Sequence, residues 1–262
     1  MMRLPRPRPG LGKDQDKNLS PYPLCKLAPG SVFALSQSIF GLRKTVTMKN
    51  AHTYYQLIID KSGSMYGNLE ETVEGVNQQV MRIKEIAGRY PRQKIYTSLA
   101  FFNHDFFPVW TILPAHQLHE ISYADYRPAG TTALLDAIGH AISGMQAELG
   151  EAIEHEDATA VVVIFTDGYE NASRHFTPGQ ISSLIIDLES TGKWTFSYIG
   201  STLDAVEIAT NLGIRRGNAM HFSVNDIRAM YGKLDDSLEQ YIRTKSSNHP
   251  DVGDYLGELE EM

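Results

Sequence analysis

The chain has 262 residues, of which 42% are hydrophobic and 21% charged, and its formal net charge is -7. This length suits one sizeable α/β domain with appendages and is short for two independent cores. The acidic balance argues against a nucleic-acid partner, because binding to phosphate backbones needs clustered Lys and Arg. The single cysteine, Cys25, excludes an intrachain disulfide and a cysteine-based zinc site. It fits a reducing compartment, so we expect a cytoplasmic protein. No run of 18 apolar residues occurs, and we expect no membrane span.

The two ends of the chain differ in composition from its middle. Six prolines stand among polar and charged residues in the first 30 positions, a composition that cannot bury much apolar surface. We therefore expect residues 1–47 to form a flexible extension, residues 48–245 to form the folded domain and residues 246–262 to form a frayed acidic tail. Met48 directly precedes the first globular-looking segment, which makes it a candidate for the natural start beside Met1.

Short apolar runs alternate with longer helical periodicities from Tyr54 onward. The runs that predict strands are Tyr54–Ile59, Ile95–Phe102, Ala160–Thr166, Thr195–Ile199 and Met220–Phe222. The helical stretches between and after them are Leu69–Gly88, Ala133–Leu149, Pro178–Thr191, Leu203–Leu212 and Asp226–Ile242. A further run, Phe107–Leu113, follows a turn-prone segment and contains Pro108, which suits an antiparallel edge strand. The pattern predicts an α/β fold, doubly wound, with a mostly parallel central sheet, one antiparallel edge strand and helices on both faces.

The candidate chemistry begins where the first predicted strand ends, at Asp60-Lys61-Ser62-Gly63-Ser64. Asp60, Ser62 and Ser64 alternate along the chain, so their side-chain oxygens can converge on one point while Gly63 lets the backbone turn. Ligands of doubly wound sheets bind at the carboxyl ends of strands. A hard cation such as Mg2+ takes about six oxygens, waters included. One carboxylate, two hydroxyls and water suit such an ion.

Two further loops fall at the same predicted edge. Gly130-Thr131-Thr132 leads into the helix predicted from Ala133, where Thr131 offers another hydroxyl and either threonine can cap the helix. Thr166-Asp167-Gly168 ends a predicted strand and supplies a second carboxylate. With Asp60-x-Ser62-x-Ser64, these loops resemble, in the same order, the three-loop metal-ion-dependent adhesion site of von Willebrand factor A domains.

The resemblance covers roughly Tyr54–Ile242. Two stretches, Phe165–Ser173 and Phe196–Gly200, are similar to free-standing bacterial and phage members of the family rather than to the domains inserted in integrins. Ala129 stands where the family commonly has a glycine, which affects only the local loop geometry. The family implies an α/β Rossmann-like fold for this part of the chain.

The resemblance also implies a ligand set for a divalent cation. Ser62, Ser64 and Thr131 would supply hydroxyl ligands, and Asp60 and Asp167 would bind directly or through water. The expected ion is Mg2+, with Mn2+ or Ca2+ as alternatives. Neutral hydroxyls leave such a cation electrophilic, so we expect a protein partner that contributes an acidic residue to the metal. The expected role is a protein-binding adaptor without catalytic activity.

Each loop has a simpler structural interpretation when it is taken alone. Asp60–Ser64 suits an Asx turn or a helix N-cap, Thr131 suits a cap, and Asp167 before Gly168 suits an ordinary turn. The conjunction of all three at strand ends of one sheet favours the metal site.

Two other functions remain as alternatives. The chain could be a non-catalytic, metal-binding subunit of a separate ATPase or kinase-like system, as A domains often are. A metal-dependent phosphohydrolase is less favoured, because aspartyl-phosphate phosphatases carry a second Asp as acid and base where Ser62 stands here. The sequence also lacks a phosphate-binding Gly-x-x-x-x-Gly-Lys-Ser/Thr loop and a Gly-x-Ser-x-Gly nucleophile elbow.

We predict that residues 1–47 are dispensable for folding, because their proline-rich polar composition cannot join a layered core. A chain that begins at Met48 should melt within a few degrees of the full-length protein, and limited proteolysis should remove the extension first. An insoluble chain, or one that melts far lower, would make the extension structural.

Overall fold

The computed structural model describes residues 51–155, 157–223, 226–246 and 255–256, so the predicted extension 1–47 lies outside the described residues. Its sheet has six strands in the order β3-β2-β1-β4-β5-β6. The strands are β1 (Ala51–Asp60), β2 (Gln93–Phe102), β3 (Phe106–Pro114), β4 (Ala158–Thr166), β5 (Trp194–Gly200) and β6 (Ala219–His221). Neighbouring strands are parallel except β2 and β3, which are antiparallel. The predicted fold class is confirmed, including the single antiparallel strand at an edge.

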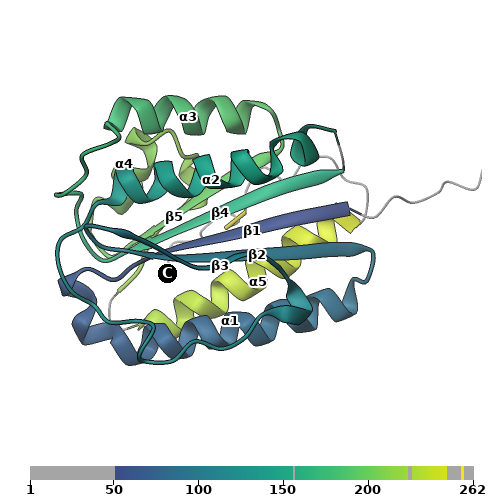
Figure 1. Ribbon diagram of the computed structural model, residues 1–262, viewed down its shortest axis with the longest axis horizontal. Helices are drawn as coiled ribbons and strands as arrows, with labels where there is room; N and C mark the ends of the chain where they lie inside the picture. Colours follow the sequence, from purple (N-terminus) through teal and green to yellow (C-terminus); the bar gives the residue numbers. More distant parts are fainter. Residues whose placement is uncertain (1–50, 156, 224–225, 247–254, 257–262) are drawn as a thin grey trace, which may run out of the picture. The chain divides into compact units, whose positions relative to one another are not determined.

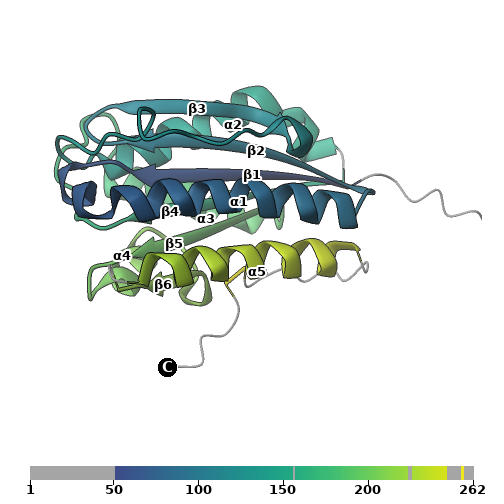
Figure 2. The same cartoon turned by 90° about the horizontal axis from the view of Figure 1, so that it is seen from below.

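Helices cover both faces of this sheet (Figure 1). The helices are α1 (Leu69–Arg89), α2 (Leu134–His155), α3 (Pro178–Ser190), α4 (Ala205–Asn211) and α5 (Ile227–Ser246), with short 3-10 helices η1 (Gly63–Asn68), η2 (Ala115–Gln117) and η3 (Arg216–Asn218). Helices α1 and α5 lie side by side on one face, and α2, α3 and α4 lie on the other (Figure 2). None of the helices in the described ranges is both long and apolar enough to cross a membrane.

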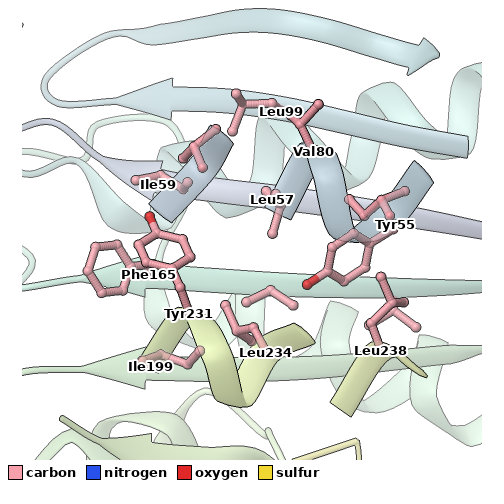
Figure 3. Packing of buried hydrophobic residues seen from close by; sticks show 14 of the residues in the cluster. Tyr55, Leu57, Ile59, Val80, Leu99, Phe165, Ile199, Tyr231, Leu234 and Leu238 are labelled. Carbon is pink, nitrogen blue, oxygen red and sulfur yellow. The ribbon is translucent and has the colours of Figure 1, made fainter. Parts of the chain in front are cut away.

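The central strands are buried on both faces, which explains their near-continuous apolar sequences. Successive side chains of β1 point to opposite faces of the sheet. Tyr55, Leu57 and Ile59 belong to the core beneath α1 and α5, whereas Tyr54 and Ile58 belong to the core beneath α2 and α3. Figure 3 shows the first of these cores, in which Tyr55, Leu57 and Ile59 face side chains of α1 and α5.

Helix α1 and helix α5 approach closely at Gly75. A Cβ placed on Gly75 would lie 2.0 Å from the ring of Tyr231 in α5, so the ring occupies the space that any side chain would need. One turn further along α1, Gln79 Nε2 donates to Asp235 Oδ1 of α5 at 2.6 Å. The two helices are therefore held together by close packing of Tyr231 on Gly75 and, one turn further along, by a buried hydrogen bond between Gln79 and Asp235.

The edge strand β3 departs from regular pairing. Pro108 and Pro114 both lie within it, and the register against β2 shifts on either side of Leu99. Ile112 has a φ of 51°, and its N–H donates to the Ser98 hydroxyl at 2.8 Å. Prolines and irregular register are tolerated at an edge because the outer side needs no ladder partner.

Several predicted boundaries differ from the structure. Helix α2 extends to His155 rather than ending at Leu149, and α4 begins at Ala205, which leaves Leu203 outside it. Most of the predicted acidic tail lies outside the described residues. Tyr255 and Leu256 within it are buried in the core beneath α5, so the prediction of a frayed tail is wrong at these two residues. Their apolar side chains explain the difference, since burial removes them from water.

We predict that Gly75→Ala destabilises the protein by about 1–3 kcal/mol, because the new methyl group overpacks the contact with Tyr231. Gly88→Ala, in the same helix, is the matched control: a Cβ at Gly88 meets no atom within 4 Å. This control should stabilise by about 0.5–1 kcal/mol, since alanine is the better helix former. Urea unfolding measures both changes, and equal stability of the two variants would contradict the packing argument.

Candidate metal centre

The register of the central strands places Asp60 beside Thr166. Ile59 of β1 pairs with Phe165 of β4, so the last residues of the two parallel strands leave the sheet together. The Thr166 hydroxyl donates to Asp60 Oδ2 at 2.6 Å, and both side chains are buried. Asp60 is thus held at the carboxyl edge of the sheet, where doubly wound folds bind ligands.

The loop after β1 continues this polar cluster. The Ser62 N–H donates to Asp60 Oδ1 at 2.6 Å, which is the Asx turn that the sequence offered as a simpler interpretation. Ser62 Oγ lies 3.1 Å from Ser64 Oγ, and Ser64 Oγ donates to Asp167 Oδ1 at 2.6 Å. The structure therefore brings together Asp60, Ser62, Ser64 and Asp167, and the turn forms part of their arrangement.

The loop that contains Thr131 also reaches this cluster, through its backbone. The Gly63 N–H donates to the Gly130 carbonyl at 3.0 Å. Gly130 has a φ of +80°, and a Cβ there would lie 2.4 Å from His104 Nδ1, so a side chain at this position would clash. The backbone approach between the two loops thus depends on this glycine.

The side chains of the two adjacent threonines differ in position. Thr131 is exposed, and none of the hydrogen bonds between described residues involves its hydroxyl. Thr132 is buried, and its Oγ1 lies 3.5 Å from the point where a Cβ on Gly168 would stand, while Ser64 Oγ lies 3.6 Å from that point. The hydroxyl of Thr132 therefore borders the cluster, whereas no hydrogen bond between described residues joins the Thr131 side chain to it.

Residues that the sequence analysis did not single out hold the loops in place. The Thr132 N–H donates to Asn171 Oδ1 at 2.9 Å, and the Asn171 N–H donates back to the Thr132 carbonyl at 3.0 Å. The Leu135 N–H donates to Glu170 Oε2 at 3.0 Å. The first turn of α2 is thus capped by the loop after β4, and the prediction that Thr131 or Thr132 caps it is wrong. The polar residues after Gly168, which include Glu170 and Asn171, were the sequence signal that could have indicated these hydrogen bonds.

Two further hydroxyls bond to the backbone of the site. The Tyr126 hydroxyl, which is buried, donates to the Asp60 carbonyl at 2.6 Å. The Ser201 hydroxyl, which follows β5, donates to the Asp167 carbonyl at 3.0 Å. Both aspartates are therefore fixed through their main chains as well as their side chains.

The two carboxylates lie in a partly desolvated setting. Burial raises the pKa of Asp60 from 3.8 to about 6, hydrogen bonds from Thr166 and Ser62 oppose this shift, and the nearby charge of Asp167 adds to it. Burial also raises the pKa of Asp167, against the hydrogen bond from Ser64. The intervening Lys61 places its Nζ 3.5 Å from the centroid of the Phe107 ring. A nearby cation would favour the charged form of both aspartates.

The donor set fits a hard divalent cation. All side-chain donors in the cluster are carboxylate or hydroxyl oxygens, the ligands that Mg2+, Mn2+ and Ca2+ take. Over the part of the chain that the structure describes, no group of three or more His, Cys, Asp or Glu suits a metal. A site at Asp60 and Asp167 would consequently depend on serine and threonine hydroxyls in addition to its two carboxylates.

The fold and this cluster define a doubly wound α/β domain with an oxygen-lined site at the carboxyl edge of its sheet. The sequence model of the von Willebrand factor type A domain family matches residues 56–232. This match covers more than half of the chain, which therefore belongs to that family. The family predicted from the three loops is confirmed. No curated protein is similar enough in sequence to match.

Solved structures are similar to this chain at low sequence identity. The pilus adhesin SpaC from Lactobacillus rhamnosus GG has a TM-score of 0.51 at 12% identity, covering 73% of this chain and 30% of that chain. Proximal thread matrix protein 1 from the mussel byssus, with a zinc-occupied metal-ion-dependent adhesion site, has a TM-score of 0.45 at 20% identity. The match covers 72% of this chain and 46% of that chain. Manganese-loaded TRAP protein from Plasmodium vivax has a TM-score of 0.46 at 17% identity, and the match covers 70% of this chain and 72% of that chain. The chain thus spans about half the length of the mussel protein.

We predict that Asp60 makes the metal-free protein less stable as the pH rises from 4 to 7. Its pKa in the folded state, about 6, exceeds the unfolded value of 3.8. The folded state therefore binds more protons in this range, and the stabilising contribution present below pH 3.8 is lost as the pH rises through 6.

In EDTA at pH 7, Asp60→Asn should therefore be more stable than the wild type by about 1–3 kcal/mol, and its pH profile should be flatter. Asp187→Asn, at an exposed position on α3, is the control and should follow the wild type. Urea unfolding at several pH values gives the profiles. Parallel profiles for the wild type and Asp60→Asn would refute the prediction.

Proposed function

We propose that this chain is a protein-binding adaptor domain that depends on a divalent cation held at Asp60, Ser62, Ser64, Thr131 and Asp167. The observation that carries the proposal is the unbroken series of contacts from Asp60 through Ser62 and Ser64 to Asp167. Family membership supports it. Hydroxyls and carboxylates from the loops after β1 and β4 meet there, and the Thr132 hydroxyl of a third loop borders them.

The proposed cation is Mg2+, with Mn2+ or Ca2+ as alternatives. The all-oxygen donor set favours these hard ions. When bound, the ion supplies an electrophilic centre for a carboxylate from outside the chain. Ser64 is exposed and Asp167 is half-buried, so the cluster is accessible from solvent on that side. These features support a partner that contributes an Asp or Glu side chain.

Two alternatives make different predictions. A non-catalytic subunit of a separate ATPase or kinase-like system would bind that enzyme through the same site. A metal-dependent phosphohydrolase would need a second acid or base where Ser62 stands. We propose that the chain has no such activity, and hydrolysis of a generic phosphoester that is lost in Asp60→Ala would favour the enzyme.

We further propose a cytoplasmic location on the basis of the single cysteine.

Partner capture tests the proposal directly. The immobilised full-length chain should retain a partner from lysate in Mg2+ and release it in EDTA. Asp60→Ala and Ser62→Ala should lose the partner by at least about tenfold while keeping the fold, as circular dichroism would check, because both residues lie at the carboxyl edge of the sheet and belong to neither hydrophobic core. Equal capture in EDTA and in Mg2+ would rule out the metal-dependent mechanism.

The two adjacent threonines allow a sharper test of the ligand set. If Thr131 is the hydroxyl ligand predicted from the sequence, Thr131→Ala should weaken Mg2+ binding by about tenfold and Thr132→Ala should not. The position of Thr132 Oγ1 near Ser64 Oγ favours the reverse. Thr131→Ser and Thr132→Ser retain a hydroxyl and serve as matched controls. Titration calorimetry with Mg2+ measures all four variants, and a loss in neither alanine variant would exclude this loop as a ligand.

A further inference from the structure

Three exposed apolar side chains lie in loops that belong to the candidate metal centre or neighbour it. Leu203 is 94% exposed, Tyr66 is 75% exposed and Tyr169 is 56% exposed. Tyr66 follows Ser64 by two residues, and Tyr169 follows Asp167 by two residues. Leu203 lies in the loop after β5, the strand next to β4. Large apolar side chains at such exposure mark interaction sites when they cluster beside polar groups.

Hydrogen bonds join the loops that carry Tyr169 and Leu203 to the cluster. The Tyr169 hydroxyl donates to Asp204 Oδ1 at 3.0 Å, which ties the tyrosine to the residue that follows Leu203. The Ser201 hydroxyl donates to the Asp167 carbonyl at 3.0 Å. Tyr169 and Leu203 therefore lie on two loops, after β4 and after β5, that hydrogen bonds join to each other and to Asp167, and together they define the apolar flank of the site.

The charges near this flank restrict what can lie on it. Leu203 borders an open depression of about 550 Å³, whose lining also includes Asp204, Glu207 and Arg216. Two carboxylates against one guanidinium disfavour further acidic groups there. An acidic residue of a partner would thus be directed to the cation, and its neighbour on the flank would be apolar rather than acidic.

We infer that the partner presents a single Asp or Glu together with an apolar residue that packs on Tyr169 and Leu203. This inference rests on the proposed function, because the acidic residue is the one bound by the cation. Neighbouring strands lie about 4.8 Å apart, so the flank lies roughly 5–10 Å from the cluster. An extended segment advances about 3.3 Å per residue. The apolar residue consequently stands two or three positions from the acidic residue.

A peptide array tests this pattern without knowledge of the natural partner. The probes are nine-residue peptides with one central Glu or Asp in which each flanking position is varied in turn through Leu, Phe, Ser, Lys and Glu. Binding of the labelled full-length chain is measured in Mg2+ and in EDTA. We expect Leu or Phe two or three positions from the acid to strengthen Mg2+-dependent binding by about tenfold over Ser, and Glu there to weaken it.

Variants assign the effect to the flank. Leu203→Ser should remove the preference for the apolar residue, and Leu203→Met should keep it. Ile186→Ser is the matched control, since Ile186 is 52% exposed but lies within α3. Its preference should equal that of the wild type.

The outcomes separate this inference from the proposed function. Mg2+-dependent binding of acidic peptides with no preference for an apolar neighbour, or with a preference unchanged in Leu203→Ser, would overturn the inference and leave the proposed function standing. Binding of apolar peptides that is equal in EDTA would overturn both. A chain that binds Mg2+ by calorimetry and no acidic peptide in the array would also refute both.

Discussion

Ile59 of β1 pairs with Phe165 of β4, and this register holds Asp60 against Thr166 at the edge of the sheet. A slip of one residue would exchange the faces to which the side chains of β1 point, moving Tyr55, Leu57 and Ile59 out of the core that they share with α1 and α5. The register is therefore enforced by hydrophobic packing along β1. The position of the buried carboxylate at the site therefore follows from the packing of the apolar side chains that precede it in β1.

The burial of Asp60 that this packing imposes costs free energy, since desolvation disfavours the charged form of the carboxylate. Hydrogen bonds from the Thr166 hydroxyl and the Ser62 N–H recover part of that cost; Thr166 is the last residue of β4, and Ser62 lies in the loop after β1. A second buried carboxylate shows the same direction of pKa shift in a different setting. Asp235 lies between α1 and α5, where burial raises its pKa to about 6 while Gln78 and Gln79 donate to it. It faces helices rather than a loop edge, which suits a structural role.

Much of the fold was predictable because the period of the apolar residues changes between strand and helix along the chain. Asp60 and Asp167 were predictable because each directly follows a buried strand. The choice of Thr131 over Thr132 rested on the family resemblance alone, since consecutive residues of a non-helical segment point in different directions and no local pattern says which one faces the site. Contacts from Tyr126 to Asp60 and from Asn171 to Thr132, across 66 and 39 residues, follow from tertiary packing that no local pattern encodes.

Two carboxylates bind backbone N–H groups and thereby fix the loop that follows Asp167. Asp136 accepts from the N–H groups of Arg174, His175 and Phe176, and although burial acts in the opposite direction, these bonds lower its pKa overall. Glu170 accepts from the N–H groups of residues 172 and 173 and from Leu135 at the start of α2. Asp167 and Tyr169 thus stand at the beginning of a segment that is anchored to α2 by hydrogen bonds independent of any cation. Since ordering a loop on binding costs free energy, a loop that is already anchored leaves more of the contact energy for the ion and for a partner.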